Sequence, residues 1–192
     1  MSIYGITGAI STGKTFVADY LISLGYTVFD ADNLCRRSYY DIDICKQIYK
    51  IFPNLEGILG DQLRDKISQF IFQDLSKLKL LENIIQPYIR SEMQEFIDVN
   101  KDDKFLFLDI PLLFENKMED LFDKIIVTDC SEANIYKRLI SRGYDEDKIK
   151  QILAKQIDKD IKREKASCVI NTDNSEDDTF KQVNYILQKI TT

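Results

Sequence analysis

The stretch from Gly8 to Thr15 has the pattern G-x-x-x-x-G-K-T, in which each fixed residue type suits phosphate binding. The two glycines let the backbone approach a ligand more closely than a Cβ atom would permit. Lys14 has the length and charge to reach the terminal phosphates of a nucleotide, and the Thr15 hydroxyl can ligate Mg²⁺. At the start of a helix, such a loop also directs unpaired N–H groups at one point. The pattern predicts a phosphate-binding loop made of Gly8, Ala9, Ile10, Ser11, Thr12, Gly13, Lys14 and Thr15.

Carboxylates follow two apolar segments. Asp30-Ala31-Asp32 closes the first, at the edge of a sheet where ligands of open α/β folds bind. One of these aspartates could be the base for a substrate hydroxyl, or both could serve as helix cap and turn residues. Proximity to a phosphate loop favours the functional interpretation. Asp109 closes the second segment, as a Walker-B-type aspartate would, and the alternative is again a capping carboxylate.

Basic and nucleophilic side chains give weaker indications. Arg138 and Arg142 are four residues apart on an expected helix, so they share a face and could clamp a phosphoryl group, but exposed arginines are common. The chain has no histidine, which excludes Ser-His and Cys-His mechanisms. Its four cysteines are scattered, so reduced structural thiols are expected rather than a zinc site.

Short apolar runs predict five strands, at residues 2–7, 26–30, 105–110, 124–128 and 168–171. Helical segments follow several of them, and this alternation indicates a parallel α/β sheet. Between the second and third strands, apolar residues recur every three or four positions, which predicts a helical insertion. Residues 145–165 are densely charged and helical, either a mobile arm or a solvated surface helix.

The composition is that of a soluble globular chain. The 192 residues are 44% apolar and 30% charged, which fits one domain with an inserted subdomain. The net charge of -6 argues against nucleic-acid binding, and no apolar run approaches the roughly 20 residues that span a bilayer. We therefore expect a cytoplasmic enzyme with small-molecule partners, either monomeric or a weak homo-oligomer.

Several of these motifs together resemble the dephospho-CoA kinases, which use ATP to phosphorylate the ribose 3'-hydroxyl of dephospho-CoA in the last step of coenzyme A synthesis. The resemblance covers nearly the whole chain. It rests on "GITGAISTGKTFVADYLISLGYTVFDADNLCR", "LRDKISQFIFQD", "QPYIR" and above all "DIPLLFEN" at residues 109–116. Arg138, Arg142, Gln156 and Lys162 then follow in the expected order before "VIN".

The resemblance implies a P-loop kinase fold with a five-stranded parallel sheet, a helical substrate-binding insertion and a helical lid. It implies a nucleotide-binding core at residues 1–36 and 104–192, a CoA-binding insertion at 37–103 and a lid at about 142–165. ATP and Mg²⁺ would be the cofactors. The roles implied are Asp32 as general base, Lys14 and the phosphate loop for ATP, Thr15 for Mg²⁺, Arg142 as lid arginine with Arg138 a weaker candidate, and Arg90 and Phe114 for the substrate.

The chain departs from the family pattern at a few positions. Ala9, Ser11 and Thr12 stand where the family prefers Gly, Gly and Ser, and Ser11 matters most if its site needs a positive φ. Gln86 replaces the histidine of a His-Pro pair, and Asn171 replaces an acid. Three alternatives stay open: a nucleoside monophosphate kinase, a nucleotide or CoA sensor without turnover, and a regulatory GTPase. The best local hint of a GTPase is "NKME" at residues 116–119, which lacks the aspartate that would bind guanine.

Overall fold

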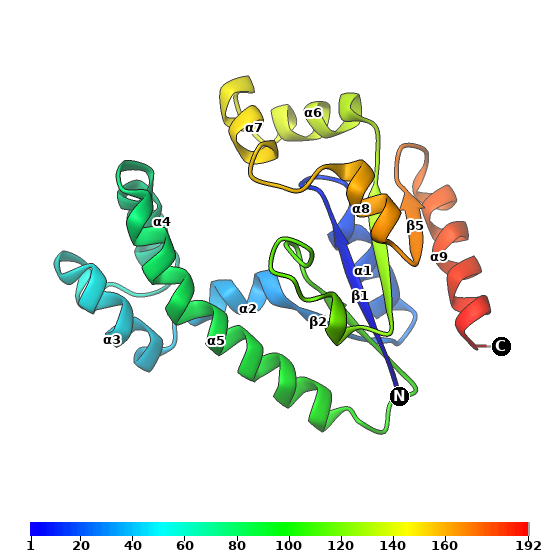
Figure 1. Ribbon diagram of the computed structural model, residues 1–192, viewed down its shortest axis with the longest axis horizontal. Helices are drawn as coiled ribbons and strands as arrows, with labels where there is room; N and C mark the ends of the chain where they lie inside the picture. The colour runs from blue at the N-terminus through cyan, green and yellow to red at the C-terminus, as the bar shows by residue number, and fades with distance from the viewer. Residues whose placement is uncertain (192) are drawn as a thin grey trace. The chain divides into compact units, whose positions relative to one another are not determined.

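A five-stranded sheet with the order β2-β3-β1-β4-β5 forms the centre of the fold (Figure 1). In this computed structural model, which describes residues 1–191 apart from the side chains of residues 72, 73, 75 and 191, β1 pairs in parallel with β3 and β4, and β4 with β5. The strands are β1 Ser2–Gly8, β2 Thr27–Asp30, β3 Phe105–Asp109, β4 Lys124–Asp129 and β5 Cys168–Asn171. The predicted parallel α/β sheet is confirmed, with strand ends that differ from the expected ones by one residue at most.

Helices α1 (Lys14–Ser23) and α9 (Glu176–Thr191) pack against one face of the sheet. Alternate residues of the strands point to this face, so β1 supplies two buried apolar side chains to the same core, and β3, β4 and β5 supply one each. The core consists of Tyr4, Ile6, Phe107, Ile126 and Ile170 from the strands, Val17 and Leu21 from α1, and Val183, Ile186 and Leu187 from α9.

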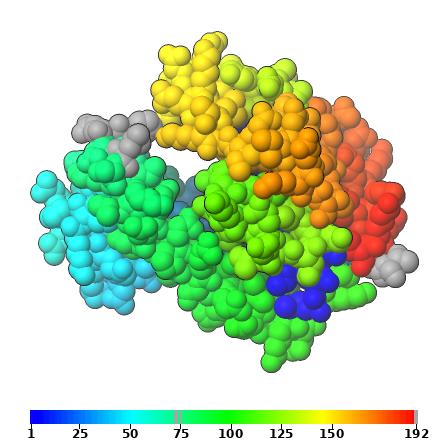
Figure 2. Space-filling view, viewed as in Figure 1, coloured from blue at the N-terminus to red at the C-terminus, as the bar shows by residue number. Residues whose placement is uncertain are grey.

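The segment between β3 and β4 lies against the sheet at Gly5, which leaves room for its side chains. A Cβ atom on Gly5 would lie 2.7 Å from Leu113 and 3.1 Å from Phe122. The segment includes the short helix η2 (Glu119–Leu121), and α8 (Lys159–Lys165) contacts β4. Figure 2 shows residues of this segment in light green and α8 in orange. Little of the blue start of the chain, which includes β1, is visible on the same face.

Helices α6 (Glu132–Ser141) and α7 (Glu146–Leu153) share a smaller apolar cluster. Ser131 and Asp145 cap their N-termini through side-chain oxygens, and Gly143 turns the chain between them with φ 85°. The buried members are Cys130, Ile135, Leu139 and Ile149, with Ile10, Tyr136, Tyr144 and Leu153 packed at the margin. Through Ile10, the predicted phosphate loop touches this cluster.

The chain forms two compact units, one of residues 1–29 and 101–192 and one of residues 30–100. The second unit is helical, as the apolar spacing predicted: α2 Ala31–Ser38, α3 Ile42–Ile51, η1 Pro53–Leu55, α4 Gly60–Gln73 and α5 Leu75–Val99. It has a core of its own, to which α3, α4 and α5 contribute Ile48, Leu63, Ile67, Leu81 and Ile85. Within residues 1–191, no helix combines the length and the apolar character needed to cross a membrane.

Candidate active site

The predicted phosphate loop connects β1 to α1, in the arrangement that the G-x-x-x-x-G-K-T pattern requires. A Cβ atom on Gly8 would overlap the Thr128 hydroxyl and lie 2.6 Å from the Thr128 carbonyl oxygen, so no larger residue fits. Gly13 precedes α1 with φ 88°, a left-handed conformation that glycine adopts without strain. The site of Ser11 does require a positive φ, of 66°.

Hydroxyl groups hold the loop together from inside and from the neighbouring strands. The Thr12 hydroxyl donates to the Ala9 carbonyl at 2.8 Å and lies 2.8 Å from the Thr128 hydroxyl. The Thr172 hydroxyl, just after β5, donates to the Thr12 carbonyl at 2.8 Å. Thr128 and Thr172 were not singled out from the sequence, since a threonine near a strand end has no distinctive pattern.

Lys14 and Asp109 meet at the carboxyl end of the sheet. The Lys14 ammonium forms an ion pair with the Asp109 carboxylate, and the two side chains are 12% and 3% exposed. Parallel pairing explains the meeting, because β1 and β3 are neighbours and Ile6 is in register with Asp109. The structure thus brings together the phosphate-loop lysine and the acid that closes β3.

Arg138 is tied directly to the loop. One guanidinium nitrogen donates to the Ser11 carbonyl and to the Thr172 hydroxyl, each at 3.0 Å, and the other donates to the Thr172 carbonyl at 2.5 Å. Burial raises the pKa of the nearby Cys130 thiol, although the Arg138 guanidinium opposes this effect. Arg138 is therefore hydrogen-bonded to the phosphate loop, whereas its sequence pattern did not distinguish it from an ordinary exposed arginine.

A pocket of about 220 Å³ adjoins the loop. Both arginines line it, so their i, i+4 spacing does place them at one site, as the sequence suggested for a phosphoryl clamp. The lining residues are Ser11, Gly13, Phe16, Arg138, Arg142, Thr172, Asn174, Glu176 and Thr179. The combination of backbone amides, guanidinium groups and an aromatic ring suits a nucleotide.

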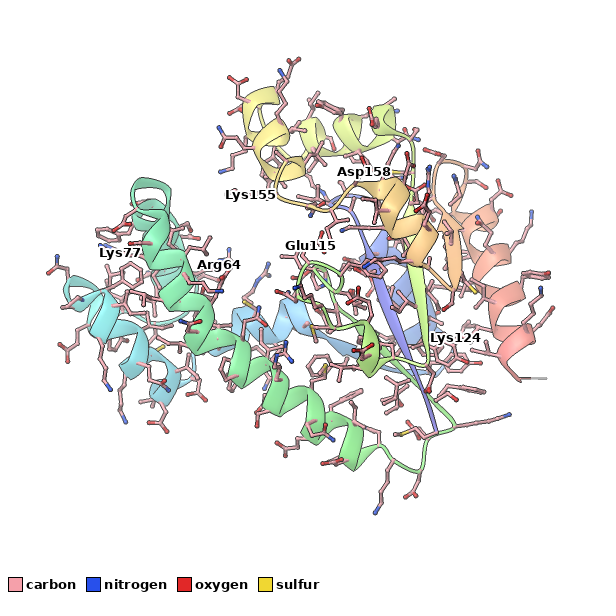
Figure 3. The ribbon with its side chains drawn as sticks, in the orientation of Figure 1. Arg64, Lys77, Glu115, Lys124, Lys155 and Asp158 are labelled. Atoms are coloured by element: carbon pink, nitrogen blue, oxygen red, sulfur yellow. The ribbon has the colours of Figure 1, made fainter. Side chains whose placement is uncertain are left out.

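Two carboxylates, one in the segment after β3 and one at the end of β4, bind basic side chains of α8. Glu115 forms an ion pair with the Lys162 ammonium at 2.8 Å and accepts from the Ile157 amide at 3.0 Å, and the Lys162 side chain is only 1% exposed. Asp129, at the end of β4, accepts from Arg163, and this hydrogen bond raises the pKa of the guanidinium. Figure 3 labels Glu115 on the loop after β3 and Asp158 at the start of α8.

Gln156, just before α8, contacts the phosphate loop itself. Its side-chain oxygen accepts from the Ile10 amide at 3.0 Å. Residue patterns indicated no role for Gln156 beyond its place in the family order. The contact joins positions that are 146 apart in the sequence, so local spacing does not reveal it.

Of the other candidate residues, Asp30, Asp32 and Arg90 belong to the helical unit, and Phe114 belongs to the unit that contains the sheet. Asp30 is the N-cap of α2, accepting from the Asn33 amide at 2.9 Å, whereas Asp32 is exposed in the first turn. Capping thus accounts for only one of the two aspartates. Arg90 lies on α5. Phe114 is 2% exposed, with the Lys165 ammonium 5.5 Å from its ring centroid.

Comparison with known proteins agrees with this geometry. The family model described as dephospho-CoA kinase matches residues 2–178. A dephospho-CoA kinase of Bartonella quintana is 37% identical, with 99% of this chain and 98% of that protein covered. Among solved structures, TT1252 of Thermus thermophilus matches with a TM-score of 0.84 and 28% identity over 100% of this chain and 98% of that one. The dephospho-CoA kinase of Campylobacter jejuni matches with a TM-score of 0.74 and 27% identity over 98% and 96%. This chain belongs to the dephospho-CoA kinase family, whose members transfer a phosphoryl group from ATP to dephospho-CoA.

Proposed function

We propose that this chain transfers the γ-phosphoryl group of ATP to the ribose 3'-hydroxyl of dephospho-CoA, giving coenzyme A and ADP. Family membership supports the reaction. The observation that carries the proposal is the phosphate loop of residues 8–15, with Lys14 paired to Asp109 and an arginine-lined pocket beside it. These backbone and cationic groups suit phosphoryl transfer, because the reaction depends on positioning and charge stabilisation more than on covalent chemistry.

In the proposed mechanism, the loop amides and Lys14 hold the ATP phosphates. Arg142 stabilises the negative charge of the transferring group from its place in the pocket. Asp32, in the first turn of α2, accepts the proton of the 3'-hydroxyl. In a chain without histidine, a carboxylate is the natural base.

Mg²⁺ is part of the proposal because the oxygen donors at the loop fit this ion. Thr15 lies in the first turn of α1, and its hydroxyl would be a ligand together with phosphate oxygens. Among the residues that the structure describes, no cluster of three or more acidic, cysteine or histidine side chains could hold a metal. Bound at the loop, the ion would neutralise phosphate charge.

The main substrate region is proposed to be the helical unit, which contains Arg90, and Phe114 of the other unit is proposed as a further residue that binds dephospho-CoA. Arg90 offers a guanidinium group for a phosphate of the substrate. Residues from about 142 to 165 are proposed as the lid, which would exclude water so that the phosphoryl group reaches the ribose instead. ATP and dephospho-CoA are the proposed partners in the cytoplasm.

The first test is a coupled assay of ADP release with purified protein, Mg-ATP and dephospho-CoA, run on the wild type, Asp32→Asn and Asp30→Asn. We expect coenzyme A formation by the wild type and a fall in kcat of about 10² or more for Asp32→Asn, since a general base contributes roughly 10²–10⁴. Asp30→Asn is the matched control, because asparagine caps a helix as well as aspartate does. It should keep kcat within about threefold of the wild type, since a retained cap leaves the site in place.

A panel of nucleoside monophosphates separates the alternatives. Turnover of a monophosphate without turnover of dephospho-CoA would overturn the proposed substrate. ATP binding with no turnover of any acceptor would favour the sensor alternative. An equal loss in both aspartate variants would argue that the segment is needed for structure and that Asp32 is not the base.

A further inference from the structure

Ser11 has a backbone conformation that its side chain disfavours. Its φ of 66° is in the left-handed region, where a Cβ atom clashes with the following carbonyl oxygen. The hydroxyl does not compensate, because it is buried and forms no hydrogen bond to any of the residues that the structure describes. Glycine would adopt the same conformation without this cost. The loop must therefore be held in shape by contacts from elsewhere.

Two side chains from outside the loop bind backbone groups of Ile10 and Ser11. Gln156 accepts from the Ile10 amide at 3.0 Å. Arg138 donates to the Ser11 carbonyl at 3.0 Å. The first contact holds the peptide group between Ala9 and Ile10, one residue before the strained position, and the second holds the peptide group that follows Ser11. Together they oppose relaxation of Ser11 to a negative φ.

The side chain before Ser11 is also held. Ile10 packs at the margin of the apolar cluster that α6 and α7 share, which includes the buried Ile149 and Leu139. A change of φ at Ser11 would turn Ile10 relative to the Ser11 carbonyl, so it could not preserve both the contacts of Ile10, with Gln156 and with this cluster, and the hydrogen bond from Arg138. The loop conformation and the position of the segment before α8 are thus linked.

We propose that Gln156 is a positioning residue for ATP binding, which acts by holding Ser11 of the phosphate loop in its left-handed conformation. The inference rests on the proposed function, since it takes the loop of residues 8–15 as the ATP site. A glutamine suits the role because its neutral side-chain carbonyl accepts a hydrogen bond from the Ile10 amide without placing a negative charge beside the phosphates. If the loop relaxes in a fraction of molecules, the apparent affinity for ATP falls by the same fraction.

The test is a mutant cycle between Gln156 and Ser11, with the Kd of Mg-ATP measured by calorimetry on the full chain. Gln156→Met keeps the side-chain length but removes the acceptor, and Ser11→Gly removes the strain. We expect Gln156→Met to raise Kd about fivefold, as the loss of one hydrogen bond would. In the Ser11→Gly background the same change should raise Kd by less than about twofold, because the loop no longer needs the contact.

Two control variants separate this role from a general structural effect. Ser11→Ala removes the hydroxyl but keeps the Cβ atom, so it should not rescue Gln156→Met. Gln182→Met removes a pair of contacts outside the loop, between the Gln182 side-chain amide and the backbone of Asn171 at 2.9 and 2.8 Å. Whatever effect Gln182→Met has on Kd, that effect should be the same in the wild-type and Ser11→Gly backgrounds.

Steady-state kinetics give a second readout of the same role. Gln156→Met should show a raised KM for ATP with kcat nearly unchanged, because the loop adopts the same conformation once ATP is bound. A fall in kcat with an unchanged KM would mean that Gln156 acts on the chemical step and would overturn the inference.

The outcomes distinguish the inference from the function on which it rests. If the wild type does not bind Mg-ATP, the proposed function fails. If the wild type binds but Gln156→Met leaves Kd unchanged, or if Ser11→Gly does not reduce its effect, Gln156 does not act through Ser11. Rescue by Ser11→Ala as well as by Ser11→Gly would assign the effect to the hydroxyl and would also overturn the inference.

Discussion

At the scale of single residues, Asp173 explains why an asparagine can replace the acid that the family prefers at position 171. The Asp173 carboxylate accepts from the Ser131 amide and hydroxyl, each at 2.7 Å, and from the Asn134 side chain at 2.8 Å. Asn171 donates to the same carboxylate at 3.2 Å and accepts from the Asp173 amide at 2.9 Å. An aspartate at position 171 could only accept, so it would place two carboxylates together.

This network gives the stability of the protein a defined pH dependence. Burial alone would raise the pKa of Asp173, but the hydrogen bonds from Ser131, Asn134 and Asn171 lower it well below its usual range. A carboxylate with a lowered pKa stabilises the folded state above the unfolded pKa of about 4, and the effect is lost as the pH falls. We expect Asp173→Asn to lower Tm at pH 7 by roughly 4–8 °C, equivalent to about 2 kcal/mol for charged hydrogen bonds. In thermal unfolding, the difference from the wild type should shrink progressively as the pH falls below about 5; a constant difference would contradict the argument.

Residue patterns predicted the part of the site that is local in sequence. The phosphate loop from Gly8 to Thr15 can be recognised from the sequence, because all its characteristic residue types lie within eight consecutive positions. The contacts of Arg138 and Gln156 with that loop carry none, because they join positions separated by 127 and 146 residues. Their side chains are polar and partly exposed, as most arginines and glutamines are, so only tertiary structure reveals their partners.

At the scale of elements, α8 depends on the buried ion pair between Lys162 and Glu115. Removing one partner leaves the other charge buried and uncompensated. We expect Lys162→Met to lower the free energy of unfolding by about 3 kcal/mol in urea titrations. The matched control is Lys165→Met on the same helix, whose partner Glu119 lies at the same 2.8 Å but whose side chain is 47% exposed. That variant should cost less than about 1 kcal/mol.

The double variant Lys162→Met with Glu115→Gln tests whether the stranded charge is the cause. Glutamine keeps an oxygen for the Ile157 amide and removes the charge, so the double variant should be more stable than Lys162→Met alone. If both variants are equally unstable, loss of packing by Lys162 and not the buried carboxylate accounts for the effect.

The elements themselves followed closely from the sequence. Continuous apolar runs located all five strands, because strands buried on both faces need them. The apolar spacing located α4 and α5, whose Leu63, Ile67, Leu81 and Ile85 form the core of the helical unit. The strand order β2-β3-β1-β4-β5 did not follow, since it depends on which strands pair across long connections.

At the scale of the whole molecule, the two compact units each have a core, so each can respond to a ligand of its own. A ligand slows hydrogen exchange in the cooperative unit that it stabilises. The proposed roles assign ATP to the unit of residues 1–29 and 101–192, and they assign dephospho-CoA mainly to the unit of residues 30–100. With each ligand added alone, exchange should therefore slow in different peptides.

We expect Mg-ATP to slow exchange at residues 8–18, 136–144 and 171–180, which contain the loop and the pocket residues. Dephospho-CoA should slow exchange in α4 and α5. The side chains of these two helices share one apolar core, so we expect their amides to open together. AMP at the same concentration is the control, because it carries a nucleotide but no pantetheine arm, and it should leave α4 and α5 unchanged. Hydrogen exchange followed by mass spectrometry measures all three. If dephospho-CoA protects only the peptides that Mg-ATP protects, the helical unit is not the binding site of the substrate, even though the chain keeps its family's reaction.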